Sequence, residues 1–150
     1  MKRAEQQLKH FNFLTSEINS LYHEAALRFG LSDSAMMVLY AVCDHEGSCL
    51  LHEIGRLSGT SKQTVHSAVR RLEEEGYVWL DAYDGRKKVV RLTERGEELM
   101  GRTALRLIRI EEEIWDSWTQ EECELSLRLT QRYLDSFRTR VAGISRQEKD

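Results

Sequence analysis

The chain has 150 residues and a formal net charge of −3, with 41% hydrophobic and 31% charged side chains. This composition is typical of one soluble globular domain and argues against a disordered chain or a membrane protein. No stretch approaches the roughly 20 apolar residues of a spanning helix, and no secretory signal is visible at the N-terminus. Three cysteines, an odd number, fit a reducing compartment better than a disulfide framework. We therefore expect a cytoplasmic protein without a membrane partner.

Charge and proline content add two constraints. Residues 51–91 carry eight basic and six acidic side chains, a net charge of +2, whereas both flanking segments are acidic. A locally basic surface on an acidic protein can bind phosphate, because charges act over about a Debye length, ~8–10 Å. The chain has no proline, which permits long helices.

Two helices are predicted before residue 48. Apolar residues spaced three and four apart predict a helix over residues 8–29, with Gly30 as its stop. Ser32 is a candidate N-cap for a second helix that ends at Gly47. The side chains that this second helix should bury are Met36, Leu39, Tyr40 and Cys43.

A helix-turn-helix is predicted next. Leu51, Ile54 and Leu57 mark a short helix, and residues 58–61 form a compact polar turn. Ser61 is the candidate N-cap of a further helix that ends at Gly76. Two short helices joined by a tight turn with glycine have the layout of a helix-turn-helix. The expected inward residues of the second helix are Val65, Ala68, Val69 and Leu72.

A hairpin and two further helices complete the prediction. Residues 77–80 and 88–92 are rich in strand formers, and Asp84-Gly85 supplies the turn between them. Thr93 is expected to cap one long helix that reaches about Trp118, and residues 119–122 form a capping box for the last helix. The buried positions expected in the long helix are Leu99, Leu107, Ile108, Ile114 and Trp115.

The outward face of the second helix of the motif combines side chains that read bases with side chains that bind phosphate. Acidic residues, which an ordinary solvated face would mix in, are absent until residues 73–75, so we favour DNA binding. The hairpin adds three cations at or beside its tip, although a basic turn can also simply keep an edge strand soluble. The outward residues are Lys62, Gln63, His66, Ser67, Arg70 and Arg71, and the hairpin cations are Arg86, Lys87 and Lys88.

Catalytic and metal motifs are not found in the sequence, so we expect neither an enzyme nor a cofactor. Cys43, His45, Cys49 and His52 are zinc-ligand types within ten residues, but their spacing matches no standard structural zinc site. We therefore interpret this group as structural and predict no metal, with redox sensing as the less favoured alternative.

The run from Leu31 to Gly96 resembles the MarR family of winged-helix transcription regulators. Four segments carry the resemblance: SKQTV at residues 61–65, LEEEGYV at 72–78, DGR at 84–86 and LTERG at 92–96. They match, in order, the start of the recognition helix, the entry to the wing, the wing motif and the exit from the wing. The flanking helices agree with the family in number and order.

The resemblance implies a single domain over 1–150, mainly α with a β-hairpin wing. The winged helix-turn-helix lobe would cover about 31–96, and helices at about 5–29 and 97–143 would form a homodimer. Such a dimer binds a pseudo-palindromic operator in double-stranded DNA. Many members respond to a small-molecule effector, which favours a repressor here and leaves an activator open. The implied DNA-binding residues are Ser61, Lys62, Gln63, Thr64, His66, Ser67, Arg70, Arg71, Arg86, Lys87 and Lys88, with Asp84 stabilising the wing.

Two departures from the family concern the wing. The stretch from Gly76 to Asp84 is shorter than is common, and Leu80 stands where many members have arginine. Either the wing contacts DNA more weakly, or Lys87 and Lys88 carry more of the contact. The alternative function is a winged-helix module that binds protein without reading DNA, against which the outward cations of residues 62–71 argue.

Overall fold

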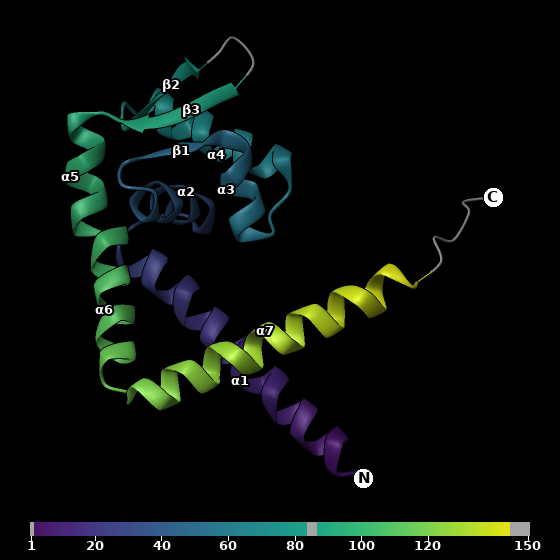
Figure 1. Cartoon of the computed structure of the whole chain (residues 1–150). Helices are drawn as coiled ribbons and strands as arrows, with labels where there is room; N and C mark the ends of the chain where they lie inside the picture. Colours follow the sequence, from purple (N-terminus) through teal and green to yellow (C-terminus); the bar gives the residue numbers. More distant parts are fainter. Residues whose placement is uncertain (1, 84–86, 145–150) are drawn as a thin grey trace. The chain divides into compact units, whose positions relative to one another are not determined.

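The computed structural model describes residues 2–83 and 87–144, and the chain divides into two compact units, Met1–Arg109 and Ile110–Asp150. The predicted fold class is confirmed: helices predominate, and one small antiparallel sheet contains the hairpin (Figure 1). The elements in chain order are α1 (Arg3–Arg28), α2 (Asp33–Asp44), β1 (Ser48–Leu50), α3 (Leu51–Ser58), α4 (Lys62–Glu74), β2 (Val78–Tyr83), β3 (Lys87–Leu92), α5 (Glu94–Arg102), α6 (Ala104–Asp116) and α7 (Gln120–Ala142).

Side-chain caps start four of the helices at the predicted residues. The hydroxyl groups of Ser32, Ser61, Thr93 and Thr119 each accept a hydrogen bond from the backbone N–H three residues on, at 3.1–3.2 Å. At Thr119 the carboxylate of Glu122 accepts the backbone N–H in return, which completes the capping box. These bonds satisfy donors that the first turn of a helix leaves without a partner, and they fix where α2, α4, α5 and α7 begin.

Helix α2 lies at the centre of the first unit because it contributes to two apolar clusters. Val38, Ala41 and Val42 pack with α3, α4 and the sheet, whereas Met36 and Leu39 pack with α1, α5 and α6. The sequence interpretation assumed one buried face, so it missed the first set. Of its predicted core residues, Tyr40 and Cys43 are only half-buried and Leu57 is exposed. The four predicted residues of α4, Val65, Ala68, Val69 and Leu72, are all buried.

The sheet has three strands in the order β1-β3-β2, and the first strand was not predicted. Strand β1 pairs with β3 through Cys49 opposite Val90, and β2 pairs with β3 from Val78 opposite Leu92 to Tyr83 opposite Lys87. Three residues carry too little alternation to identify a strand, and the extended backbone of β1 is stabilised by β3, some 40 residues away in the chain. Figure 1 shows the sheet beside α2, α3 and α4.

A set of contacts closes the base of the hairpin. The Thr93 hydroxyl donates to the Gly76 carbonyl at 2.7 Å, and the Thr93 backbone N–H donates to the Tyr77 carbonyl at 3.0 Å. Arg95 donates to the Glu75 carbonyl at 3.1 Å and lies over the Tyr77 ring. A Cβ atom at Gly96 would stand 1.9 Å from the Tyr77 carbonyl oxygen, so only glycine fits there. The segments 72–78 and 92–96, which the resemblance singled out separately, are therefore one structural feature.

The prediction of one long helix after Thr93 is wrong. The structure has two helices there, α5 and α6, separated at Thr103. The Thr103 side chain is buried and donates to the Leu99 carbonyl at 2.6 Å, a bond to the preceding turn that bends helices. Leu99 and Leu107 are buried as expected, but Ile108 is half-buried, and Ile114 and Trp115 are exposed. Helix α7 has no buried residue within the described part of the chain.

Among the described residues, no single helix is long and apolar enough to cross a membrane. Helices α1 and α2 meet that test of length and composition only as a pair, across a bend of 95°. Five residues of α2 are buried in the core of the first unit.

Candidate nucleic-acid interface

The turn between α3 and α4 sets the direction of the predicted recognition helix. Gly59 ends α3 in the left-handed conformation, at φ +64°, which glycine adopts without steric cost. The Ser61 hydroxyl caps α4 and lies 2.9 Å from the Thr64 hydroxyl. The buried residues of α4 fix one face of the helix in the core, so its other face and its N-terminal turn are presented to solvent.

Every residue of α4 that the sequence predicted to face outward is exposed, and so are the capping Ser61 and the neighbouring Thr64. The first turn carries no acidic residue. Arg71 forms an ion pair with Glu75 at 3.1 Å, whereas Arg70 has no ion pair within the described part of the chain. This face therefore offers one arginine held along the helix and one arginine available to an anion.

A basic hollow lies on one side of α4. It is a cavity of about 670 Å³ that extends from α3 across α4 to the first residues of β3. Among the described residues, all the charged or titratable ones that line it are basic, and they are His52, Arg56, Lys62, His66, Lys87 and Lys88. The predicted cations of α4 and of the hairpin thus line one surface.

His52 and Arg56 extend this basic surface onto α3, and the sequence interpretation missed them. They are four residues apart and therefore lie on one face of a helix. That spacing was readable in the sequence, but only the apolar positions of the segment were used. A second hollow, of about 500 Å³, lies along the other side of α4. It is lined by Gln63, Ser67 and Arg71, with Ser34 of α2 and the N-cap Ser32 that precedes it.

The hairpin consists of β2, which ends at Tyr83, and β3, which begins at Lys87. Lys87 and Lys88 are exposed at the start of β3, opposite Tyr83 and Ala82. Arg91 forms an ion pair with Asp81 at 3.0 Å and lies over the Trp79 ring, so its charge is already partnered on the sheet. The predicted wing residues Asp84 and Arg86 lie outside the described residues.

A separate cavity of about 590 Å³ is lined by α1, α2 and α3 in the first unit. Its walls include Tyr22, Met36 and Tyr40, and His23 Nδ1 lies 2.8 Å from the carboxylate of Asp33, another lining residue. This size is within the range of small-molecule sites, and the lining combines aromatic and thioether groups with a few polar ones.

The cysteines differ in exposure. Cys43 and Cys123 are half-buried, whereas Cys49 is buried, and none of the three forms a disulfide. Burial raises the pKa of the Cys49 thiol to about 11, with the carboxylates of Glu53 and Asp44 adding to the effect. A buried thiol with a raised pKa reacts slowly with oxidants, so Cys49 does not suit a redox sensor.

Comparison with known proteins gives a consistent picture. The MarR family model matches residues 29–87. No curated protein matches the chain. A MarR family regulator from Neisseria meningitidis is 18% identical, with a TM-score of 0.77 and coverage of 95% of this chain and 98% of that one.

Two further similar structures were solved with a bound molecule. Reduced AbfR bound to DNA is 22% identical, with a TM-score of 0.56 and coverage of 90% and 94% of the two chains. The organohalide-sensing regulator RdhR in its 2,4-dichlorophenol-bound form is 18% identical, with a TM-score of 0.59 and coverage of 87% and 79%. The predicted resemblance to the MarR family is thus confirmed over residues 29–87, and the winged-helix fold is shared with these structures.

Proposed function

Since the chain has the MarR fold and matches that family over residues 29–87, we propose that it is a sequence-specific DNA-binding transcription regulator. The observation that carries the proposal is the exposed face of α4, which has no acidic residue from Lys62 to Leu72, with the basic hollow beside it. The DNA-bound form of the similar AbfR structure supports double-stranded DNA as the partner.

The α4 residues divide by chemistry into reading and anchoring groups. Gln63 and His66 lie on the first two turns, the part of a recognition helix that enters the major groove. Glutamine can pair with an adenine edge through two hydrogen bonds, whereas Lys62 and Arg70 suit guanine or phosphate. Lys87 and Lys88, and Arg86 at the hairpin tip, are proposed to contact the backbone or the minor groove. Ser61, Thr64, Ser67 and Arg71 complete the proposed contact surface.

We propose that the regulator is a homodimer formed by residues about 5–29 and 97–143. Helix α1 buries only Ala26, and Phe11, Ile18 and Leu21 are each half exposed or more. On α7, Tyr133, Phe137 and Val141 are about half exposed, and none of its residues is buried. Apolar area of this extent usually marks an interface, and a twofold dimer buries such a surface against its copy. Two lobes would then read a pseudo-palindromic operator.

The cavity bounded by α1, α2 and α3 is the proposed effector site. It joins a proposed dimerisation helix to the helices of the DNA-binding lobe, so an occupant that prefers one arrangement of these helices would shift DNA affinity. The dichlorophenol-bound form of the similar RdhR structure supports a small aromatic ligand. We propose repression released by such a ligand.

Binding to selected DNA tests the function. The operator is first selected from random fragments with the purified protein, and variants are then compared on that operator and on scrambled DNA. Gln63→Ala should lower discrimination at one base position in each half-site by ~1–3 kcal/mol and leave the affinity for scrambled DNA nearly unchanged. Equal loss on both DNAs would contradict the placement of Gln63 in the groove.

Anchoring is tested with a matched pair of arginines. Arg70→Ala should weaken binding to all sequences and lower the salt dependence by about one ion per lobe. Arg3→Ala, at an exposed position at the start of α1 and outside the proposed dimerisation residues, is the control and should change neither quantity. Arg86→Ala should behave like Arg70→Ala if the short wing reaches DNA. Failure of the wild type to select any DNA would favour the protein-binding alternative.

A further inference from the structure

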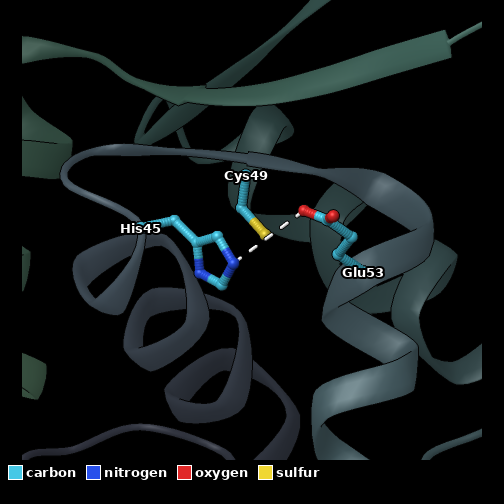
Figure 2. Close-up of side chains that lie close together, drawn as sticks. All are labelled: His45, Cys49 and Glu53. Atoms are coloured by element: carbon cyan, nitrogen blue, oxygen red, sulfur yellow. Dashed lines mark ion pairs between the residues drawn. The ribbon is translucent and has the colours of Figure 1, made fainter.

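Three side chains from three different elements point toward one another in the first unit (Figure 2). His45 ends α2, Cys49 lies in β1, and Glu53 lies in the first turn of α3. One potential ligand atom from each lies within 4.8 Å of the other two, and His45 Nε2 is 3.8 Å from a carboxylate oxygen of Glu53. This group differs from the one considered from sequence, since Glu53 takes the place of Cys43 and His52.

The histidine is held in the orientation that a metal ligand needs. Its Nδ1 lies 2.9 Å from the Ala41 carbonyl oxygen, which can only accept a hydrogen bond, so Nδ1 carries a proton. In the neutral ring Nε2 therefore has the lone pair, and it faces Cys49 and Glu53. Histidines that bind metals usually donate the other ring nitrogen in this way, because the bond fixes both the tautomer and the ring plane.

The dimensions of the group are close to those of a four-coordinate site. Zinc bonds of about 2.0–2.3 Å at tetrahedral angles place ligand atoms roughly 3.4–3.6 Å apart. The distance between His45 Nε2 and the Glu53 carboxylate is already near this value. Because Glu53 is part exposed, its side chain can rotate to bring the carboxylate within bonding distance of the same ion. Cys49 is only 2% exposed, whereas the His45 and Glu53 side chains are each about a third exposed, so an ion has a path from solvent to a buried sulfur.

We propose that His45, Cys49 and Glu53 form a binding site for one divalent cation of the Zn²⁺ class, with solvent as the fourth ligand. Imidazole, thiolate and carboxylate together suit this borderline-soft ion, whereas Mg²⁺ and Ca²⁺ require oxygen ligands. The site belongs to the lobe itself and is independent of the proposed DNA-binding function.

Binding has a defined proton balance. The Cys49 thiol loses its proton to solvent as the sulfur–metal bond forms, and the metal replaces that proton. The carboxylates of Glu53 and Asp44, which favour a neutral thiol when no cation is present, favour a cation at the same position. A bound ion would connect the end of α2, β1 and α3, and through β1 it would support the central strand β3.

Cobalt substitution of the full-length, metal-stripped protein tests the site. The wild type should bind one Co²⁺ per chain, with a thiolate-to-cobalt charge-transfer band in the near ultraviolet, and Zn²⁺ should displace it. Cys49→Ser should abolish the band, whereas the double variant with Cys43→Ser and Cys123→Ser should retain it. A band that survives in Cys49→Ser, or a wild type that takes up no Co²⁺, would overturn the proposal and leave an ion pair beside a buried thiol.

Because Cys49 is in the core, Cys49→Ser could fail to fold, and a second variant at a part-exposed ligand tests the site without that problem. Glu53→Gln, at a part-exposed position, should keep the circular dichroism spectrum and lower the Zn²⁺ affinity at least ~10-fold. His52→Gln, on the same helix but outside the cluster, is the matched control and should bind like the wild type. Zn²⁺ should raise the melting temperature of the wild type and of His52→Gln, and raise that of Glu53→Gln much less. Equal Zn²⁺ affinity in the two variants would overturn the proposal.

Discussion

The segment from α2 to β3 and the terminal helices α1 and α7 differ in where their apolar side chains lie. In the first, Val38, Leu39, Ile54 and Val90 are fully buried within the unit. Within the described helices α1 and α7, only Ala26 is buried, although leucine and aromatic side chains recur along both. The lobe therefore has its own core, whereas most apolar side chains of the two terminal helices are exposed, as the proposed dimer would require.

The largest effect is expected where the lobe is packed most tightly. Gly96→Ala places a Cβ atom 1.9 Å from the Tyr77 carbonyl oxygen, so the base of the hairpin must move. We expect a loss of at least ~3 kcal/mol in the free energy of unfolding, measured by urea denaturation.

The control for this substitution is Gly101→Ala on the same helix. Nothing lies within 4 Å of the Cβ position there, and the backbone is helical. Alanine should stabilise α5 slightly, by up to ~1 kcal/mol, because it loses less conformational freedom than glycine on folding. Similar losses for both variants would show that the lobe is not packed as described at Tyr77.

The next effect concerns the terminal helices. We expect the wild type to have twice the chain mass of 17.5 kDa by light scattering at micromolar concentration. The double variant Phe11→Asp, Phe137→Asp places charges on the exposed apolar surfaces. It should therefore be a monomer, with the mass of one chain by light scattering, and its lobe should remain folded by circular dichroism.

Trp79→Ser is the matched control for the change of mass. Trp79 is an exposed aromatic residue of β2, outside the proposed dimerisation helices, so its loss should leave the dimer intact. A wild-type chain that is already a monomer would remove the dimer from the proposal.

The smallest effect is a local one at the start of α7. Thr119→Ala removes the acceptor of one hydrogen bond of the capping box, and the free energy of unfolding should fall by about 1 kcal/mol. Because α7 lies outside the core of the first unit, hydrogen exchange should increase in α7 and change little in α2 to β3. An equal increase in both regions would contradict their separation.

Local signals made the starts of four helices predictable. The caps at Ser32, Ser61, Thr93 and Thr119 depend on residues within one turn, and all four formed as expected. The inward face of α4 was equally readable, because its period of burial is that of one helix packed on one side.

Most of the features that were not predicted from the sequence depend on contacts between residues far apart in the chain. Strand β1 is extended because β3 pairs with it, and the break at Thr103 depends on burial of that side chain. In the candidate metal group, His45 and Cys49 were noticed, whereas Glu53, four residues after Cys49, was missed because only cysteine and histidine were considered as ligands. The basic hollow likewise joins α3, α4 and β3, three elements that are separate in the sequence.

The hairpin enters and leaves the lobe at one place, where Thr93 and Arg95 bond to the Glu75, Gly76 and Tyr77 carbonyls. Strands β2 and β3 between these points are fixed by their pairing and by Val78 and Val90 in the core, and the cost of closing the loop between the two strands changes slowly with residue number. Insertions or deletions near the hairpin tip should leave the helices undisturbed. The tip of the hairpin can thus vary without the strands that support it, which makes it a suitable place to graft a longer loop onto this chain.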